Sequence, residues 1–395
     1  MRVSRDGPRM VTWTDFRAFR RGLGARRTLN ESAPHLSLIL LAVLAGAVLV
    51  PDAGAARRTV STEAGFHAAV EQMRASGGII TLRAGRYGYL RVGPRAGRWL
   101  TIRARPRAVT RYVEVHGARR VKLVDLDVVT FKGRHALLDI DRSRQVNVLR
   151  ARVRGRNGLR ARVSVTSSRG VAVRDSTFRR TRWVSLRSIG SSRVTVEGNR
   201  FVDCYGCDFL LVKATNDLVV RGNTFDRALP GLCGVEGSCN HQDLAQMTGG
   251  RRWLIEGNRF GVAYNGAAQL YITGYGPTDD VVIRGNTFLR DDPLAPGFAP
   301  WTGVVIGQPT GWLGLPRNVR IEGNTILSGY PRPHGHWIGV ANSIILTEQY
   351  AALPPGERPV VTGNVLATTT HPELLCGVAR EATGNVTESG DPVCY

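Results

Sequence analysis

The densest group of polar side chains in this 395-residue sequence lies at positions 239–246, in the run Cys-Asn-His-Gln-Asp-Leu-Ala-Gln. His241 and Asp243 are residue types that exchange protons in general acid–base catalysis. Each also has a plain structural interpretation: His241 can hydrogen-bond a loop carbonyl, and Asp243 can cap the start of a strand. Lys213, one of three lysines in the chain, could be a base or simply a solvated charge.

A short repeat organises the chain that must position these residues. Seven Gly-Asn pairs each follow a short β-branched run, and their Asn residues are 24, 35, 28, 38, 40 and 21 positions apart. Degenerate copies end at Phe178 and near Val153. The alternating apolar runs are typical of strands rather than of helical repeats. Because one unit cannot bury its own apolar face, the units are expected to stack as a solenoid.

Stacked coils would align equivalent residues as ladders. An Asn side chain tolerates left-handed backbone geometry at a turn and can bond to the equivalent amide one coil away. The two predicted interior ladders are Asn199, Asn223, Asn258, Asn286 and Asn324, and Phe178, Phe201, Phe225, Phe260, Phe288 and Ile326. After Thr62, an amphipathic segment with Phe66, Val70 and Met73 on one face predicts a helix that closes the N-terminal end.

With this repeat, residues 57–395 resemble the right-handed parallel β-helix proteins of the pectin-lyase-like superfamily. The resemblance implies an all-β fold, a right-handed parallel β-helix solenoid with a short N-terminal capping helix. It predicts one domain over residues 56–395. It implies no single activity, because that superfamily includes lyases, epimerases, hydrolases and non-catalytic proteins.

The first 55 residues read as a targeting segment. The apolar run Leu36–Val50 follows basic residues and precedes a small-residue cleavage site around Ala53-Gly54-Ala55. Its 15 residues are fewer than the ~20 that a membrane span needs. Residues 1–55 are therefore predicted to be a leader with a cleaved signal peptide, and the mature protein is predicted to be secreted, with no stable membrane span. Nothing in the sequence indicates the oligomeric state.

Charge favours an anionic partner. The formal net charge is +23, and the leader holds eight Arg and four acidic residues, which leaves +19 for the mature part. Such a surface concentrates an anionic polymer by electrostatic steering. An anionic polysaccharide is favoured over nucleic acid, because the chain is predicted to be exported and carries no nucleic-acid-binding motif. Adhesion of a basic surface to an anionic cell wall is the alternative.

All six cysteines lie in the mature part: Cys204, Cys207, Cys233, Cys239, Cys376 and Cys394. An even number after an export signal indicates disulfides. Cys376 is expected to pair with Cys394, and Cys233 with Cys239; Cys204 and Cys207 could pair locally or exchange partners with those two. A zinc site that uses Cys204, Cys207, Cys239 and His241 is disfavoured, because oxidation removes the thiolates that zinc needs.

One strand per coil can be aligned by its central inward residue, which gives the row Ile140, Val165, Leu186, Val212, Met247, Ile272 and Ile306. Side chains alternate, so the flanking positions face solvent. The expected outward rows are Asp139, Ser164, Ser185, Leu211, Gln246, Tyr271 and Val305, and Asp141, Thr166, Arg187, Lys213, Thr248 and Thr273. With coils ~4.8 Å apart, Arg187, Lys213, Gln246 and Tyr271 are predicted to contact one or two sugar residues. In this register Asp243 falls beside Asp208.

The longest insertions are expected to build a wall beside these rows. They cover Asp226–Asn240, Leu289–Pro300 and Leu327–His336, and all enter the aligned strand from the same side. Trp301 and Trp337 follow directly, and their ring faces suit sugar rings.

Uronic-acid chemistry fits these residues best. Removing the proton next to a carboxylate requires a base and a group that neutralises the carboxylate. His241-x-Asp243 resembles part of the Asp-Pro-His-Asp/Glu motif of alginate epimerases, although the Asp-Pro portion is missing. That resemblance implies that His241 is the base or acid and that Arg187 or Lys213 neutralises the carboxylate. Ca²⁺ could also neutralise it, but no acidic cluster predicts its site. No other cofactor is predicted.

Two alternatives to a polyuronate lyase or C5-epimerase stay open. A polygalacturonase-like glycoside hydrolase needs carboxylates ~5–9.5 Å apart. Asp208 and Asp243 could approach that spacing, but the Asn-Thr-Asp and Asp-Asp-Cys signatures are absent, so this function ranks lower. A non-catalytic carbohydrate-binding or cell-surface β-helix is the second alternative.

Overall fold

The computed structural model describes residues 56–131, 135–156, 159–229, 243–261, 268–289, 303–307, 314–327, 344–346, 348–367, 376 and 378–394. The chain separates into units of residues 1–51 and 52–395, and all described residues belong to the second. The leader, the Cys233–Cys239 pair, His241, Trp301 and Trp337 lie outside the described residues.

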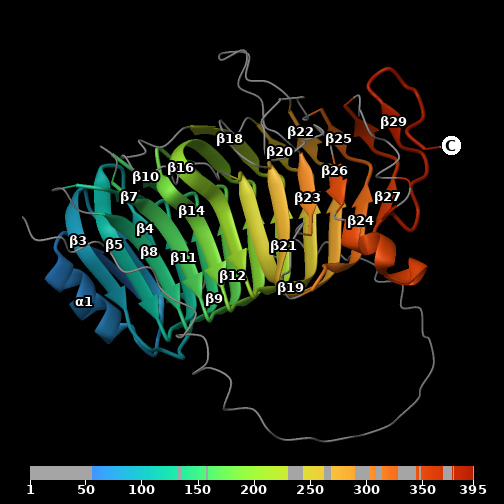
Figure 1. The fold of residues 1–395 in the computed structure, drawn as a ribbon. Coiled ribbons are helices and arrows are strands. Elements are labelled where there is room, and N and C mark those ends of the chain that lie inside the picture. Colours follow the sequence, from blue (N-terminus) through green and yellow to red (C-terminus); the bar gives the residue numbers. More distant parts are fainter. Residues whose placement is uncertain are drawn as a thin grey trace, which may run out of the picture. The chain divides into compact units, whose positions relative to one another are not determined.

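The second unit is a parallel β-solenoid, which confirms the predicted fold class (Figure 1). Strands at equivalent positions of successive coils pair in parallel and fall into three rows. The first row contains β3 (Gly85–Val92), β5 (Ala108–His116), β8 (Ala136–Asp141), β11 (Ala161–Thr166), β14 (Arg182–Ile189), the later part of β16 (Arg200–Lys213), the earlier parts of β19 (Ala245–Glu256) and β21 (Leu270–Arg284), β23 (Val304–Ile306) and β26 (Ile344–Leu346).

The other two rows complete each coil. The second row contains β1 (Arg57–Val60), β2 (Gly78–Leu82), β4 (Leu100–Ala104), β6 (Arg119–Val124), β9 (Arg144–Leu149), β12 (Arg169–Arg174), β15 (Ser192–Glu197), β17 (Asn216–Arg221), the later parts of β19 and β21, β24 (Arg317–Glu322) and β27 (Val360–Thr362). The third row contains β7 (Asp127–Val129), β10 (Arg152–Arg154), β13 (Thr177–Arg179), the start of β16, β18 (Thr224–Leu229), β20 (Arg259–Phe260), β22 (Thr287–Phe288), β25 (Thr325–Ile326), β28 (Val365–Leu366) and β29 (Val386–Thr387). Short 3-10 helices cover Glu348–Ala352 and Pro355–Glu357.

The Asn ladder between the second and third rows is present and is longer than predicted. Asn258 donates from its backbone N–H and from Nδ2 to Oδ1 of Asn286, both at 2.9 Å, and from Nδ2 to the carbonyl of Val220. The same bonds recur from Asn199 to Asn385, and these side chains are almost fully buried. Each of these amides thereby satisfies backbone groups of the preceding coil and the equivalent amides on either side, and its own polar atoms are satisfied in turn, which is what a buried polar group requires.

The turn geometry differs from the prediction in one respect. The left-handed residue at this corner is the Gly before each Asn, with φ of 63° at Gly198 and 61° at Gly257. A residue without a Cβ adopts this conformation without steric cost, and the Asn is left free to point inward. Earlier coils place Asp125, Arg150 and Asp175 at the same corner with positive φ.

The aromatic ladder is confirmed and fills the interior behind the third row. The rings of Phe201 and Phe225 are parallel within 9°, with centroids 4.8 Å apart, and Phe260 and Phe288 stack at 4.6 Å. All are fully buried. Their spacing equals the separation of paired strands, so ring stacking and strand pairing support the same register.

The helix predicted after Thr62 is present as α1 (Glu63–Gln72), at the blue end of the solenoid in Figure 1. Oγ1 of Thr62 accepts the N–H of Gly65 at 3.0 Å, and Phe66 and Val70 are buried. The Glu63 carboxylate accepts the backbone N–H of Gly88. The helix therefore fixes β3, the first strand of the first row.

Two of the disulfides considered from the sequence are formed. Cys376 bonds to Cys394, as expected, with Cα atoms 5.8 Å apart. Cys204 bonds to Cys207, so the local pairing is the one observed. This bond removes the two thiolates that the zinc alternative needed.

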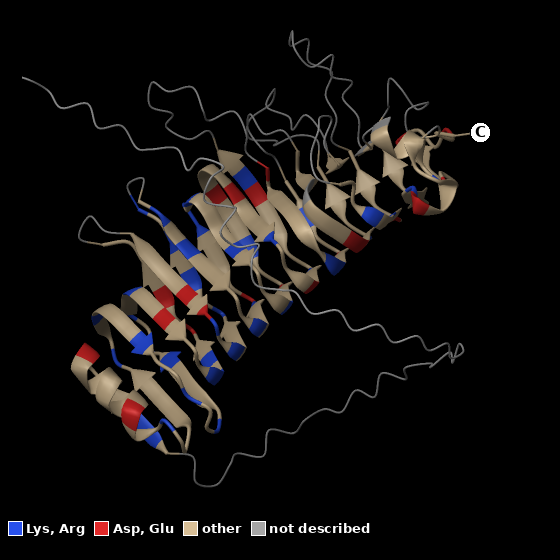
Figure 2. Cartoon of the chain, turned by 60° about the horizontal axis from the view of Figure 1, so that its bottom comes forward, with Lys and Arg blue, Asp and Glu red and all other residues tan. Residues whose placement is uncertain are grey.

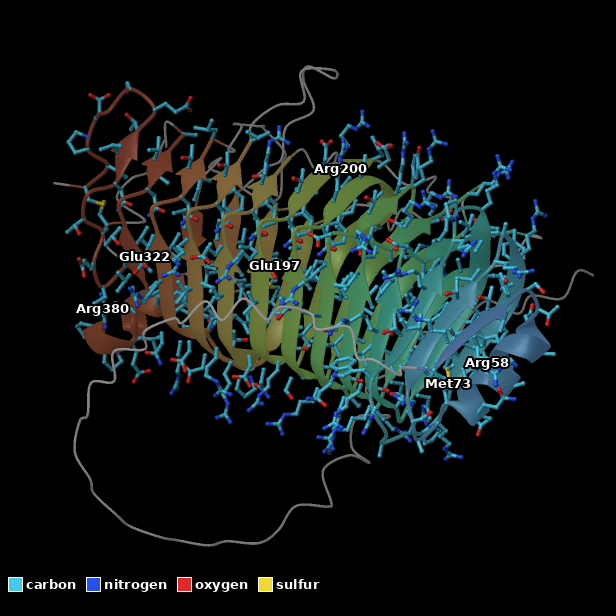
Figure 3. The ribbon with its side chains drawn as sticks, turned by 180° about the vertical axis from the view of Figure 1, so that it is seen from behind. Arg58, Met73, Glu197, Arg200, Glu322 and Arg380 are labelled. Atoms are coloured by element: carbon cyan, nitrogen blue, oxygen red, sulfur yellow. A yellow bond between two sulfur atoms is a disulfide. The ribbon has the colours of Figure 1, made fainter. Side chains whose placement is uncertain are left out.

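Charged side chains on the second row form a ladder of alternating sign. Arg174 pairs with Glu197 at 2.8 Å, and Glu256 bridges Arg221 at 2.7 Å and Arg284 at 2.6 Å. Figure 3 shows Glu197 and Glu322 on this face, and Figure 2 shows how Lys and Arg spread along the coils. Because positive and negative side chains alternate from coil to coil, these arginines form ion pairs with acidic residues on neighbouring strands.

The predicted register of the first row is confirmed for six of the seven aligned coils. Val165, Val212, Met247, Ile272 and Ile306 are aligned as expected. In β14, however, Ser188 takes the position assigned to Leu186, and Arg187 takes that of Ser185. The prediction was wrong by two residues there. A register error of two residues keeps each side chain on its predicted face of the strand, so Arg187 still points outward.

Candidate functional site

The outer face of the first row brings acidic and basic side chains together over four coils, in β5, β8, β11 and β14. Glu114, Asp139, Ser164 and Arg187 follow one another in register. His116 and Asp141 are paired two residues further on. We call the following residues the polar patch: Glu114, His116, Asp139, Asp141, Arg162 and Arg187.

Three carboxylates of the polar patch come from two neighbouring strands. Paired strands lie ~4.8 Å apart, so Glu114 and Asp139 stand one coil apart on the same face. Asp141 accepts a bond from Nδ1 of His116 at 3.0 Å, and Arg142 lies 3.7 Å from the same carboxylate. The side chains of Glu114, Asp141 and His116 are 18 %, 24 % and 31 % exposed, so a ligand can reach all three.

The environment of Asp139 favours its protonated form. Burial raises the pKa of this carboxyl above its usual range, and the nearby Asp141 and Glu114 add to the rise. A hydrogen bond with Ser164 and the charge of Arg187 act in the opposite direction and lower the pKa. A carboxyl whose pKa is raised by its surroundings is better suited to act as a general acid than one in water.

Arginines border the polar patch on the side of β11 and β14. Nε of Arg187 donates to Oγ of Ser164 at 2.9 Å, which links Arg187 to the hydroxyl that also bonds Asp139. Burial lowers the pKa of Arg162, and the nearby Arg187 and Arg160 lower it further. Two cations held this close to each other favour an anionic ligand between them.

Aromatic side chains flank the polar patch on both sides. The Tyr89 and Tyr112 rings lie 5.1 Å apart, and the Tyr89 hydroxyl bonds the Glu114 carboxylate. Burial, followed by this bond, raises the pKa of Tyr89 to about 12, so the phenol stays protonated. On the other side Trp183 is 54 % exposed, and the Arg160 guanidinium lies 3.4 Å from its ring centroid.

The predicted binding residues Gln246 and Tyr271 occupy the same outward row as Arg187. Leu211 separates Arg187 from Gln246, and Tyr271 follows in the next coil. Lys213 is exposed and lies two residues after Leu211 in β16, in the neighbouring line of side-chain positions. The structure therefore aligns Arg187, Gln246 and Tyr271 along the solenoid, with Lys213 beside them.

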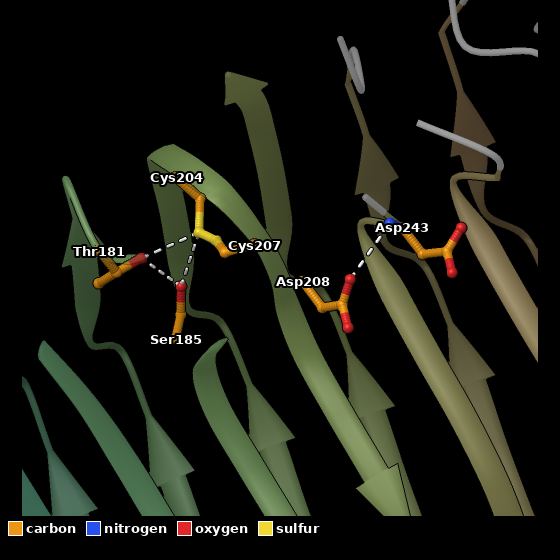
Figure 4. Close-up of a disulfide and its surroundings, with 6 residues drawn as sticks. All are labelled: Thr181, Ser185, Cys204, Cys207, Asp208 and Asp243. Carbon is orange, nitrogen blue, oxygen red and sulfur yellow. Dashed lines mark hydrogen bonds between the residues drawn. A yellow bond between two sulfur atoms is a disulfide. The ribbon is translucent and has the colours of Figure 1, made fainter. Parts of the chain in front are cut away.

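Asp208 and Asp243 lie side by side at the start of their strands, as predicted (Figure 4). Oδ1 of Asp208 accepts the N–H of Asp243 at 3.2 Å, and Oδ1 of Asp243 accepts the N–H of Ala268 at 2.9 Å. Asp243 has no exposed surface. These contacts agree with the structural interpretation, in which both carboxylates cap the start of a strand. The Cys204–Cys207 bond lies in the preceding turn, against Thr181 and Ser185.

Among the described residues, no group of three or more His, Cys, Asp or Glu side chains is placed to hold a metal ion. Within the same part of the chain, no helix combines the length and the apolar content needed to cross a membrane.

Sequence reasoning missed Glu114, His116, Tyr89, Tyr112 and Arg162 as site residues. The aligned rows began at β8, because the Gly-Asn repeat is not recognisable before that coil. Val113 and Val115 flank Glu114 and are buried, so the alternating pattern of β5 was the signal that could have extended the rows by one coil.

No family model matches the chain, and no curated protein matches it. Solved structures share its class, the parallel β-helix. The surface protein and adhesin PfbA of Streptococcus pneumoniae is 11% identical over 85% of this chain and 94% of its own, with a TM-score of 0.48. The catalytic unit of an alpha-1,3-glucanase from Streptomyces thermodiastaticus is 12% identical over 86% and 68%, also at 0.48. A mannuronic acid specific polysaccharide lyase from human gut microbiota is 15% identical over 84% and 91%, at 0.38.

Proposed function

We propose that the protein is a secreted enzyme that binds an anionic polysaccharide along the first row and cleaves it at the polar patch. The observation that carries this proposal is the pair Glu114 and Asp139, one coil apart beside Arg162 and Arg187, with the pKa of Asp139 raised by burial. The two disulfides agree with an exported protein, because such bonds persist in oxidising surroundings. Residues 1–55 remain the proposed cleaved leader.

Hydrolysis is the reaction that this pair supports best. Retaining glycosidases hold two carboxyl groups ~5–5.5 Å apart, close to the ~4.8 Å between paired strands. Asp139 would donate its proton to the glycosidic oxygen, and the C1–O bond would break. Glu114 would attack C1 from the opposite side, and water deprotonated by Asp139 would then release the sugar.

The basic residues of the polar patch define the substrate class. Arg162 and Arg187 stand next to the two carboxylates, where a sugar carboxylate or sulfate could accept their N–H groups. Tyr112 and Trp183 offer ring surfaces on either side of the same coils. A uronate-containing polymer uses all of these groups, whereas a neutral polymer offers neither guanidinium group an anionic partner.

A polyuronate lyase or C5-epimerase is the second candidate, and one observation favours it. Nδ1 of His116 is held by Asp141 at 3.0 Å, which directs Nε2 toward a ligand as a base. Arg187 would neutralise the substrate carboxylate, as proposed from the sequence. His241, Lys213 and Asp243 stay candidates for this chemistry, with Asp208, Gln246, Tyr271, Trp301 and Trp337 as binding residues. Non-catalytic carbohydrate binding is the remaining alternative.

Product analysis on a panel of polymers tests the proposal. The mature protein is incubated with polygalacturonate, alginate, a glycosaminoglycan and a neutral glucan, with and without Ca²⁺. New reducing ends without an unsaturated product indicate the proposed hydrolase. An ultraviolet-absorbing unsaturated product indicates a lyase, and solvent-proton exchange at C5 without cleavage indicates an epimerase. Binding without any of these products would refute an enzymatic role.

Replacing Arg187 by Gln should shift the alkaline limb of the pH–activity profile to higher pH. Arg187 lowers the pKa of Asp139 by favouring its carboxylate, so its loss lets Asp139 keep the proton to higher pH. The relevant measurement is the pH at which activity declines on the alkaline side. The maximal rate is less informative, because Arg187 is also proposed to contribute to binding. Arg200→Gln removes the same charge from the third row and should leave the limb in place. An unchanged limb in Arg187→Gln would argue against Asp139 as the acid.

A further inference from the structure

A second basic feature lies on the corner between the first and second rows. Arg119, Arg144 and Arg169 begin β6, β9 and β12 and are paired in register. In the next coil Ser192 takes this position and Arg193 follows it. All four guanidinium side chains are exposed. We call Arg119, Arg144, Arg169 and Arg193 the arginine ridge.

The arginine ridge is unfavourable for the folded protein by itself. Its members repeat every ~4.8 Å, and like charges directly opposite one another on paired strands are destabilising. Arg119 donates to the neutral amide of Gln145 at 3.3 Å, and no residue of the ridge forms an ion pair with a described acidic residue. The pKa of Asp217 is lowered chiefly by its hydrogen bond with Arg252, and Arg193 lowers it as well, so Arg193 has a nearby acidic group. The repulsion among Arg119, Arg144 and Arg169 is not offset by an ion pair within the described part of the chain.

Later coils of the same corner are neutralised, which makes the ridge exceptional. Nε of Arg252 lies 2.5 Å from the carboxylate of Asp217, and this bond lowers the pKa of Asp217. Asp279 and Asp280 follow in the next coil, with Asn318 bonded to Asp279 at 2.7 Å. Figure 2 shows Lys and Arg alone along the early part of this edge and mixed signs along the later part. Positive and negative side chains also alternate along the second row, so the arginines there form ion pairs, unlike those of the ridge.

We propose that the arginine ridge binds an extended polyanion that carries one negative charge per repeating unit, and that this polymer is a polyuronate. A sugar ring linked through opposite positions spans about the separation of two coils, so successive carboxylates would meet successive arginines. The ridge members Arg119 and Arg144 follow His116 and Asp141 of the polar patch by three residues each. The ridge would therefore hold a chain parallel to the solenoid axis beside the site of cleavage.

The proposal rests on the proposed substrate class but does not depend on cleavage. A polymer charged on alternate sugars would meet every second arginine only, and the remaining guanidinium groups would stay unneutralised. The ridge thus selects for charge spacing, whereas a merely basic surface would respond to total charge. Nucleic acid presents phosphates at a different spacing and serves as the competing polymer.

The test is equilibrium binding, measured in the full-length mature protein with Asp139→Asn as a common background so that no polymer is cleaved. The probes are polygalacturonate, hyaluronan, which is charged on alternate sugars, and double-stranded DNA of equal total charge. The ridge variant is Arg144→Gln/Arg169→Gln. The matched control is Arg200→Gln/Arg259→Gln, which removes two exposed arginines that lie two coils apart on the third row.

At low ionic strength the ridge variant should bind polygalacturonate about fivefold or more weakly, while the control changes less than about twofold. Its thermal midpoint should not fall, because repulsion between like charges is relieved. Equal losses in both variants would mean that only net charge matters and would overturn the proposal. An unchanged ridge variant, equal affinity for hyaluronan, or tighter binding of DNA would overturn it too. If the protein with Asp139 intact cleaves none of these polymers while the ridge still binds polygalacturonate, only the proposed function is contradicted.

Discussion

Replacing Asp139 by Asn is expected to lower kcat by about 100- to 10,000-fold, because an amide cannot donate the proton that a leaving sugar requires. Burial, with a smaller contribution from the acidic neighbours Asp141 and Glu114, raises the pKa of the Asp139 carboxyl and so favours its protonated form. Asn has almost the same volume and can still bond to Ser164, so binding and folding should change little. The measurement is the initial rate of reducing-end release from the polymer that the panel identifies.

Two comparisons make this result specific. Glu114→Gln should lose activity on the same scale, whereas Asp280→Asn, an equal change at an exposed position of β21, should keep the full rate. Restoration of Glu114→Gln activity by an added small nucleophile such as azide would support covalent catalysis by Glu114. Full activity in Asp139→Asn would remove the acid from the mechanism. It would favour the second candidate, in which His116 and Arg187 carry the chemistry.

Replacing Asn258 by Leu should destabilise the solenoid by at least about 3 kcal/mol, because several buried polar groups lose their partners at once. Oδ1 of Asn258 accepts the backbone N–H and Nδ2 of Asn223, and its own Nδ2 serves the Val220 carbonyl. Asn286 also loses one of the two donors to its Oδ1, the Nδ2 of Asn258, and keeps the backbone N–H of residue 258. Leu has the same branching at Cγ and is larger than Asn, so the change removes hydrogen bonds without opening a cavity.

The measurement is the first transition in chemical denaturation, since a stacked repeat need not unfold in a single step. Asn147→Leu is the matched control, because Asn147 lies half-buried on the outer face of the second row. Asn385→Leu should cost less than Asn258→Leu, because Asn385 accepts from Asn364 but donates to no later Asn. Equal effects at the three positions would contradict the ladder as a source of stability.

The fold was predictable because the repeat combines residue types that are compatible with one another only in stacked strands. In each repeat the Gly adopts a left-handed conformation, the Asn amide is buried, and the Phe two positions later stacks on its neighbours. All three features occur together at each corner from Gly198 to Phe288. The alternation of β-branched residues fixed which side chains point outward. The predicted identity of the left-handed residue was wrong, because the sequence shows a Gly-Asn pair without showing which of the two residues adopts a positive φ.

The site was predictable only in part, for two physical reasons. β14 pairs two residues away from the predicted register, so Arg187 rather than Ser185 lies beside Ser164, and nothing in the local sequence marks this difference. Glu114 and His116 belong to a coil without the Gly-Asn signature, so their closeness to Asp139 emerges only from strand pairing. Asp208 and Asp243 were placed correctly, yet whether a carboxylate binds a ligand or a backbone N–H depends on side-chain geometry that a sequence does not contain.

A crystal structure of the Asp139→Asn protein with a bound uronate oligosaccharide tests the central claim most directly. The account expects one sugar to lie over β5 and β8, with its glycosidic oxygen beside residue 139, the Glu114 carboxylate near C1, and Arg162 or Arg187 on a sugar carboxylate. An oligosaccharide bound elsewhere on the solenoid, with the polar patch open to solvent, would contradict the account.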